Sequence, residues 1–243
     1  MKRRDLIAGV AGGVAASPPA EARPPGQTVY IPPAHRIEDV ALLHDFMESY
    51  PFADLITTVP TLRISHIPIW LDRKAGQHGV IYGHVARNNP QSHAFDGHNS
   101  AVVVFHGPHG YISPSWYENP NSVPTWNFAA VHATGKPHPI SDETELRTLL
   151  NGLVARSEHT YAEGKYDFDR LPSELASGLM KGIVGFRMEI ELLEGKFKLG
   201  QERSEADRNS IVDHLRRAKP ERSLAEVTAA FYGRQKKNSD RQD

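Results

Sequence analysis

The sequence predicts an α+β fold that is mainly β, in which a small antiparallel barrel carries helices before and after its strands. Six or so runs rich in β-branched residues stand in the middle of the chain, and helical periodicity is strongest outside them. Few gaps between these runs are long enough for the crossovers that a parallel sheet requires. At 243 residues, 39% hydrophobic and 23% charged, the chain has the composition of one main globular domain.

The first 22 residues differ from the rest in composition. Lys2, Arg3 and Arg4 precede an apolar stretch rich in Gly and Ala, and Ala20-Glu21-Ala22 supplies the small residues of a cleavage site. This layout predicts a signal peptide over residues 1–22, and the adjacent arginines resemble a twin-arginine signal, which exports folded proteins. We therefore expect a periplasmic or secreted protein. A cytoplasmic chain with a frayed N-terminal tail is the alternative, and neither this stretch nor any other is long enough for a membrane span.

The domain itself is expected over residues 23–233, followed by a charged, mobile tail over 234–243. Four prolines between residues 23 and 34 predict an extended lead-in. Apolar residues then recur at helical spacing from Arg36 to Tyr50, where Pro51 ends the predicted helix.

Strands are predicted next, each bounded by turn residues. The first two form a hairpin around Pro60-Thr61, and an aromatic, proline-rich crossover lies between the fourth and the fifth. The last strand alternates apolar and charged residues from Phe186 to Leu193, which indicates one buried and one solvated face. The predicted strands cover residues 52–59, 62–71, 79–85, 101–105, 125–134 and 186–193.

Three further helices are predicted by caps and by apolar spacing. Ser141 caps a helix that reaches about His159, and a shorter helix covers residues 173–180. Ser204, with Asp207 three residues later, has the pattern of a capping box at the start of the last helix.

Charge and composition exclude several classes of function. The formal net charge of -1 provides no global positive field for a polyanion, so nucleic-acid binding is not expected. The absence of cysteine excludes disulfides, thiolate nucleophiles and thiolate metal sites. The chain has thirteen histidines, which leaves haem or metal binding as an alternative function. The candidate ligand pairs are His93 and His98, His106 and His109, and His35 and His44. None of these pairs has a tight metal-site spacing backed by carboxylates.

Chemically versatile residues gather in four clusters, residues 83–91, 107–117, 123–128 and 194–201, and all four are expected at strand ends. They combine cationic groups, neutral donors and flat apolar surface, which together suit an anionic nucleotide with a planar ring, such as flavin mononucleotide (FMN). No acid, base or nucleophile stands out as catalytic. The candidate cofactor-binding residues are His84, Arg87, Asn89, Ser113, Ser115, Trp116, Trp126, Lys196, Lys198 and Gln201.

The order of these motifs resembles the PaiB family from about residue 29 to 217. The residues that carry the resemblance are Val29 to Pro33, His66-Ile67-Pro68, His84 to Gln91, Gly107 to Tyr117, Val123 to Asn127 and Gly195 to Leu199. The resemblance implies an FMN-binding split barrel that forms a homodimer, with flavin sites near the subunit boundary. Members of this family are usually described as FMN-binding negative transcriptional regulators, so the resemblance also implies that role.

Two departures from the family pattern bear on function. Residues 1–28 precede the usual start of the family, which favours the signal peptide. The family's Lys-Leu-Ser-Gln-Asn is Lys198-Leu199-Gly200-Gln201-Glu202 here, so a carboxylate enters a candidate phosphate loop. We expect an exported flavoprotein with flavin-dependent redox activity. A cytoplasmic transcriptional regulator and a haem-binding split barrel are the alternatives.

Overall fold

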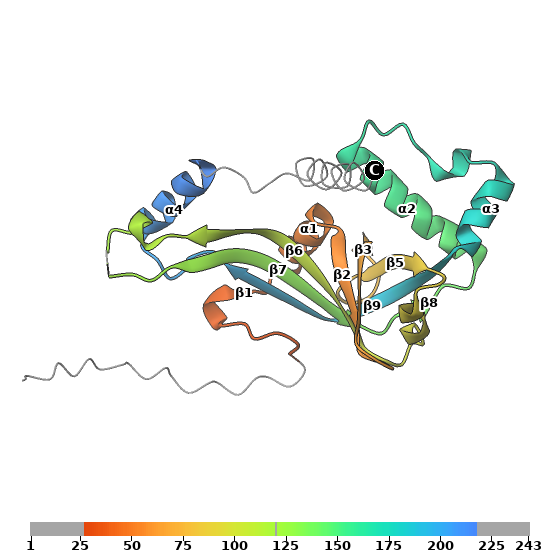
Figure 1. Cartoon of the computed structure of the whole chain (residues 1–243), viewed down its shortest axis with the longest axis horizontal. Coiled ribbons are helices and arrows are strands. Elements are labelled where there is room, and N and C mark those ends of the chain that lie inside the picture. The colour runs from red at the N-terminus through yellow and green to blue at the C-terminus, as the bar shows by residue number, and fades with distance from the viewer. Residues whose placement is uncertain (1–26, 120, 218–243) are drawn as a thin grey trace, which may run out of the picture.

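A computed structural model of the chain describes residues 27–119 and 121–217. The signal peptide and the tail predicted for residues 1–22 and 234–243 therefore lie outside the described residues. Within them, the fold is a curled antiparallel sheet with four α-helices, so the predicted mainly β class with flanking helices is confirmed (Figure 1). None of the described helices combines the length and the apolar character that a membrane crossing demands.

The sheet has the strand order β3-β2-β6-β7-β9-β5-β4, and every pairing is antiparallel. Short strands β1 and β8 add to β9. The strands are β1 (Arg36–Ile37), β2 (Phe52–Thr57), β3 (Arg63–Pro68), β4 (Trp70–Asp72), β5 (Val80–Ala86), β6 (Ala101–Ile112), β7 (Thr125–Gly135), β8 (His138–Pro139) and β9 (Ile183–Lys198). The helices are α1 (Val40–Ser49), α2 (Glu143–Tyr161), α3 (Ser173–Lys181) and α4 (Glu205–Arg217), with 3-10 turns η1 (Pro33–His35), η2 (Pro90–Ala94), η3 (Pro114–Trp116) and η4 (Phe168–Arg170).

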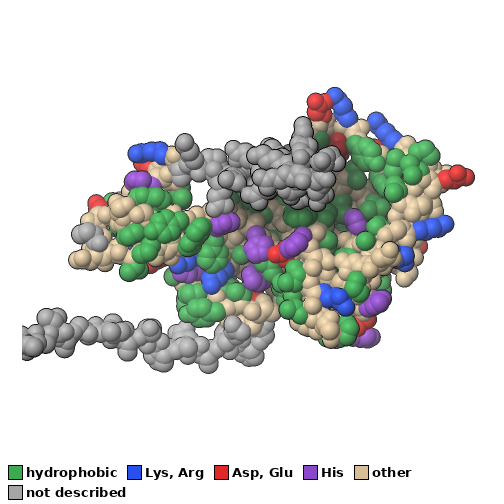
Figure 2. Space-filling view, viewed as in Figure 1, with side chains coloured by type: hydrophobic (Ala, Val, Ile, Leu, Met, Phe, Trp, Pro, Cys, Tyr) green, Lys and Arg blue, Asp and Glu red, His purple; other side chains and the backbone are tan. Residues whose placement is uncertain are grey.

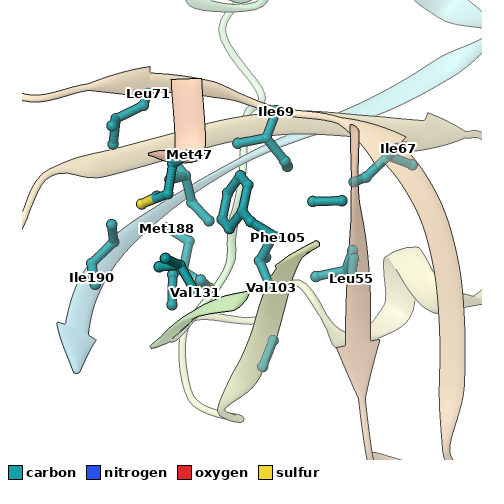
Figure 3. Packing of buried hydrophobic residues seen from close by; sticks show 14 of the residues in the cluster. Met47, Leu55, Ile67, Ile69, Leu71, Val103, Phe105, Val131, Met188 and Ile190 are labelled. Atoms are coloured by element: carbon teal, nitrogen blue, oxygen red, sulfur yellow. The ribbon is translucent and has the colours of Figure 1, made fainter. Parts of the chain in front are cut away.

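The main core fills the inside of the curled sheet. Leu55, Val103, Phe105 and Met188 point into it from three strands, and Met47 enters from α1 (Figure 3). A second cluster packs α2 and α3 against the outer side of the β4–β5 region, where Leu149 is fully buried and Trp70 and Tyr82 are partly buried. The two clusters place helices on both sides of one end of the sheet.

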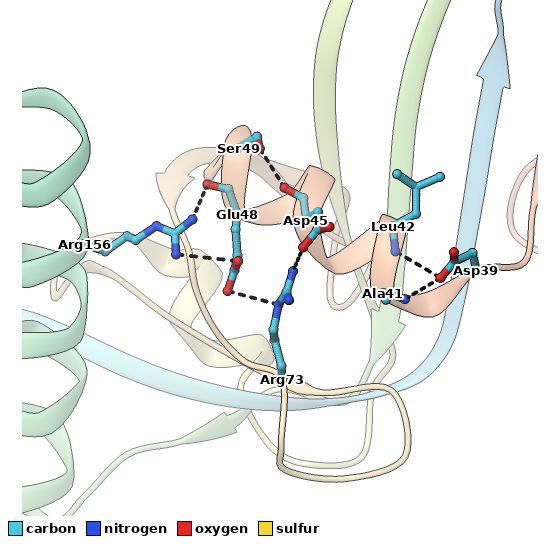
Figure 4. A network of polar contacts seen from close by, with 8 residues as sticks. All are labelled: Asp39, Ala41, Leu42, Asp45, Glu48, Ser49, Arg73 and Arg156. Carbon is cyan, nitrogen blue, oxygen red and sulfur yellow. Dashed lines mark hydrogen bonds and ion pairs between the residues drawn. The ribbon is translucent and has the colours of Figure 1, made fainter.

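A polar network fixes α1 against α2 and the turn after β4 (Figure 4). The carboxylate of Glu48 lies 3.2 Å from Arg73 Nε and 3.6 Å from Arg156 Nη1, and Arg156 also donates to the Glu48 carbonyl oxygen at 2.9 Å. Asp39 caps α1 by accepting from the backbone N–H of Ala41 and Leu42. This cap explains why the helix begins at Val40 rather than at the predicted Arg36.

Strands β6, β7 and β9 extend beyond the barrel and form an arm, which we define as residues 107–119, 121–128 and 196–217 (Figure 1). β6 passes through Gly107 and Pro108 by a register shift between His106 and His109. An irregularity of this kind tolerates proline, which has no N–H for the ladder. A Cβ on Gly107 would lie 2.5 Å from the Phe46 ring, so the close packing of α1 requires glycine there.

Helix α4 packs against the tip of the arm around a separate small core of Ile112, Tyr117 and Ile211. The Ser204 hydroxyl accepts from the backbone N–H of Asp207, which confirms the predicted cap. The Asp207 carboxylate does not complete a capping box, because it accepts instead from the backbone N–H of Glu118. It thereby ties α4 to the turn after β6.

Several predicted boundaries were wrong. The predicted strand 62–71 is two strands, because Pro68 ends β3 and β4 pairs with β5 instead. The clusters at 107–117, 123–128 and 194–201 do lie at strand ends as predicted, because they contain the end of β6, the beginning of β7 and the end of β9. The first long helix after β8 is capped by Asp142, whose carboxylate accepts from Glu145 N at 2.8 Å, rather than by Ser141.

The core makes a direct prediction about stability. Phe186 is fully buried and contacts Phe95 with ring centroids 4.8 Å apart. Replacing it, Phe186→Ala, should lower the free energy of unfolding by about 3–5 kcal/mol, because the truncation leaves a cavity. Urea denaturation measures the change, and Tyr161→Ala is the control because that side chain is 66% exposed. Equal losses in the two variants would contradict the assignment of the core.

Candidate functional site

Strands β3, β2, β6, β7 and β9 turn one side away from the main core, and we call this side the open face. Chemically varied side chains share it because alternate residues of neighbouring strands stand in register. Figure 2 shows histidine, basic and hydrophobic side chains on the visible side of the molecule. The open face carries Asp54, Ile64, His66, Val104, His106, His109, Tyr111, Trp126, Phe128, His132, Glu194, Lys196 and Lys198.

Along the arm, the open face forms a strip of aromatic rings bordered by lysines. Trp126 is 49% exposed and contacts Tyr111 edge-on, with centroids 6.2 Å apart. Lys196 Nζ lies 5.6 Å from the centroid of the Phe128 ring. Lys198 donates to Thr125 Oγ1 at 2.5 Å, which uses one of the three N–H groups of the ammonium. We call Tyr111, Trp126, Phe128, Lys196 and Lys198 the aromatic strip.

The segment from Gln27 to Pro32 lies against β9 beside this strip. Glu194 is only 3% exposed, and its Oε2 accepts from both the backbone N–H and the hydroxyl of Thr28. Lys196 donates to the carbonyl oxygen of Tyr30 at 2.8 Å and lies over the Tyr30 ring. The buried carboxylate and the lysine therefore hold this segment on the open face and add Tyr30 to the aromatic surface.

The predicted residues His84, Arg87 and Asn89 lie together at the opposite end of β9, next to α3. Arg87 donates from Nε to the carbonyl oxygen of Lys181 and from Nη2 to that of Ile183, the latter at 2.6 Å. Asn89 caps η2 and donates to Ser65 Oγ at 2.8 Å, which joins β3 to the loop after β5. Both side chains have structural partners that the sequence did not reveal.

His84 is half-buried on β5, and its Nδ1 is buried without a hydrogen-bond partner among the described residues. Burial lowers the pKa of His84 below its ordinary value, because the charged ring would lose its hydration. The ring is therefore neutral at pH 7 and does not serve as a cation for phosphate.

Arg87 borders a hollow of about 430 Å³ between the start of β9, α2 and α3. Lys181, Ser141 and Ser177 also line it, so the hollow contains two cations and two hydroxyls. The wall also contains the carboxylate of Glu143 and apolar side chains that include Leu146 and Met180. This donor set fits a phosphate group.

A third group of predicted residues lies at the tip of the arm and is engaged in local structure. Ser113 caps η3 and accepts from the backbone N–H of Ser115. Trp116 stacks on His214 of α4, with centroids 4.8 Å apart and planes 11° apart. Gln201 accepts from the backbone N–H of Leu199 and donates to the carbonyl oxygen of Phe197.

The candidate residues thus form three groups rather than one pocket. Trp126, Lys196 and Lys198 come together on the open face, whereas Arg87 lies beside the first residue of β9 and Lys198 is its last. At about 3.3 Å per residue, the 16 residues of β9 extend over up to roughly 50 Å along the strand, which is far longer than a mononucleotide. Within one chain, Arg87 and the two lysines therefore do not contact the same phosphate.

Sequence reasoning missed a row of ionisable side chains on the open face. Asp54 on β2 lies directly opposite His66 on β3, and His132 on β7 lies opposite Glu194 on β9. In residues 27–119 and 121–217, no three histidines or carboxylates are placed to hold a metal ion. The hairpin predicted around Pro60 could have revealed the pair of Asp54 and His66, since residues that face each other across a hairpin lie on the same face of the sheet.

Comparisons with known proteins place these features in a family. A model of the family described as "Putative FMN-binding domain" matches residues 29–192. The Bacillus subtilis protein named "Protease synthase and sporulation protein PAI 2" is 34% identical over 188 residues, which are 77% of this chain and 89% of the relative. An uncharacterised protein of Aspergillus fumigatus is 29% identical over 76% of this chain and 90% of its own length.

Among solved structures, the FAD and haem binding protein from Mycobacterium smegmatis has a similar fold. Its TM-score is 0.51 at 13% sequence identity, with 80% of each chain covered. At this sequence identity the likeness concerns the fold alone. The family match over residues 29–192 and the 34% identity to the Bacillus subtilis relative show that this chain belongs to the FMN-binding family of PaiB type.

Proposed function

We propose that this chain binds FMN between two copies of itself and uses the flavin in redox chemistry outside the cytoplasm. The aromatic strip carries the proposal, because its exposed rings and two lysines offer a flat apolar surface beside positive charge. When bound, FMN supplies electron transfer, and the protein supplies binding, orientation and charge.

The separation of the candidate residues supports a site shared by two copies. The aromatic strip of one copy receives the ring, and the hollow beside Arg87 of the second copy receives the phosphate. Arg87 uses two N–H groups on backbone carbonyls and retains others for a phosphate oxygen. In this arrangement the aromatic strip and the hollow beside Arg87 bind the same FMN molecule, although they lie far apart within one chain.

The open face supports the pairing of two copies. Ile64 is 54% exposed, Phe52 65% and Tyr30 63%, all on the side of the sheet that carries the strip. Apolar side chains gathered on one face favour association, because burying them releases water. The projecting arm adds a second surface that a partner copy can contact.

The first prediction concerns FMN itself. The purified chain should show flavin absorption bands or acquire them on titration with FMN, and chemical reduction should bleach them. Arg87→Ala should weaken FMN binding about tenfold or more, since a hydrogen bond to a charged group contributes about 1.5–3 kcal/mol. Trp126→Ala should also weaken binding, and Lys74→Ala, an exposed lysine on the turn after β4, is the matched control.

Mixing the two weakened variants tests the shared site. If Arg87 and Trp126 come from different copies, mixed dimers of the two variants contain one intact site, and FMN titration should recover part of the capacity. If both residues act within one copy, no mixed dimer regains a site. Absence of flavin bands and of FMN uptake in the unsubstituted chain would contradict the whole proposal.

A second prediction concerns assembly. Ile64→Lys should shift the protein from dimer to monomer in light scattering coupled to size-exclusion chromatography, because it places a charge within the proposed contact. Leu175→Lys is the matched control, since Leu175 is 51% exposed on α3, away from the open face. A monomeric unsubstituted protein, or equal behaviour of both variants, would count against the pairing.

A third prediction concerns export and rests on the sequence alone. Residues 1–30 fused to a reporter should carry it out of the bacterial cytoplasm, and replacing Arg3 and Arg4 by lysine should stop this transport. Fractionation followed by immunoblotting measures the outcome. A reporter that remains inside would favour the cytoplasmic alternative.

A further inference from the structure

Asp54 stands between two histidines on the open face, beside the aromatic strip. Its Oδ1 is paired with His66 Nδ1 from β3, and its Oδ2 lies 3.0 Å from His106 Nε2 on β6. The side chain of Asp54 is 26% exposed, and those of His66 and His106 are 67% and 60% exposed. We call these three residues the histidine–aspartate group.

The carboxylate determines which nitrogen of each ring carries hydrogen. An ionised carboxylate only accepts hydrogen bonds, so His66 must donate from Nδ1 and His106 from Nε2. In the neutral rings the opposite nitrogens, Nε2 of His66 and Nδ1 of His106, therefore keep their lone pairs. Two proton acceptors are thus presented on exposed rings, and the carboxylate of Asp54 orients both rings through their other nitrogens.

The two imidazole rings are exposed, whereas the residue beside Asp54 on β6 is buried. Val104 on the strand between Asp54 and His132 is 7% exposed and forms an apolar floor. The other ionisable groups nearby are His132, Glu194 and Lys196. Burial lowers the pKa of His132; Glu194 opposes this effect, and His106 and Lys196 add to it, so this third ring stays neutral at pH 7.

We propose that the histidine–aspartate group is a proton-transfer site for a planar weak acid bound on the open face. The proton passes from the acid to the lone pair of His106 or His66, and the resulting imidazolium is paired with Asp54. The acid becomes an anion next to the aromatic strip, where Lys196 supplies positive charge and the rings supply a flat apolar surface. Only a proton is transferred and no oxidation state changes. The step therefore needs no further reactant and does not depend on FMN.

The first test measures the tautomers of the two rings. In the full chain labelled with ¹⁵N-histidine, long-range ¹H–¹⁵N correlation at a pH where the rings are neutral should show hydrogen on Nδ1 of His66 and on Nε2 of His106. Asp54→Ala should remove the Nδ1–H preference of His66. A His66 ring with the same tautomer in both proteins would overturn the proposal, because Asp54 would then not orient it.

The second test uses 4-nitrophenol, a planar weak acid whose anion has its own absorption band. Binding to the unsubstituted protein near neutral pH should increase the phenolate band, and calorimetry in buffers of different ionisation heat should show that the protein takes up the released proton. Asp54→Ala and the double variant His66→Gln/His106→Gln should lose both signals. His93→Gln, an exposed histidine outside the open face, should retain them.

Two outcomes would overturn the proposal even if every variant folds. One is binding of 4-nitrophenol without phenolate formation. The other is phenolate formation that survives Asp54→Ala but disappears in Lys196→Gln, since the lysine alone would then stabilise the anion. Far-ultraviolet circular dichroism identifies an unfolded variant, and His66→Gln alone then replaces Asp54→Ala as the test. FMN titration of the same variants separates this result from the fate of the flavin proposal.

Discussion

The structure depends on the backbone pairing of β9. This strand of 16 residues is bonded to β5 and β8 at its first half and to β7 and β1 at its second, so barrel and arm share one continuous ladder. Glycine at 195 lets α1 approach this ladder, since a Cβ there would lie 2.3 Å from Leu43 Cδ2. The position of every candidate group follows from this strand, because Arg87 lies beside its beginning and Lys198 is its end.

A register shift between Thr134 and Gly135 decides which side chains of β9 reach the open face. Before the shift Phe186, Met188 and Ile190 point into the core, and after it Leu193 and Phe197 do. Even-numbered residues therefore change sides along the strand, which is the effect of an extra residue in an antiparallel pair. The shift turns Glu194, Lys196 and Lys198 away from the core. The register shift therefore places the lysines of the aromatic strip, and the Glu194 carboxylate that binds Thr28, on the open face.

The sequence predicted the class of fold better than it predicted how the candidate site residues are arranged in space. Alternation in the last strand was correct through Ile190 and could not reveal the shift after it, since Leu192 and Leu193 are both apolar. Arg87 and Lys198 were predicted as cations for one phosphate. Their separation depends on which strands pair with β9, and a strand's own residues contain little information about a partner a hundred positions away.

Residues engaged in local structure were also hard to recognise. Ser113 and Gln201 look like free hydrogen-bonding groups in the sequence. In the structure both side chains hydrogen-bond to nearby backbone N–H groups, as is common at turns and loop ends. Conversely, Asp54 was not singled out, and His66 was noted only within the motif His66-Ile67-Pro68 and not as a candidate site residue. They become a pair only through the hairpin register, where Asp54 faces His66 and Thr57 faces Arg63.

The small core at the tip of the arm has a consequence for the energetics of the chain. Ile112, Tyr117 and Ile211 pack with one another and with Trp116, and none of them belongs to the main cluster inside the barrel. A region with few buried contacts of its own forms a separate cooperative unit, which opens at a lower free energy than the region with the larger core. Amide hydrogens of α4 would then exchange with solvent through local opening while those of the barrel remain protected, and a partner copy resting on the arm would slow that exchange.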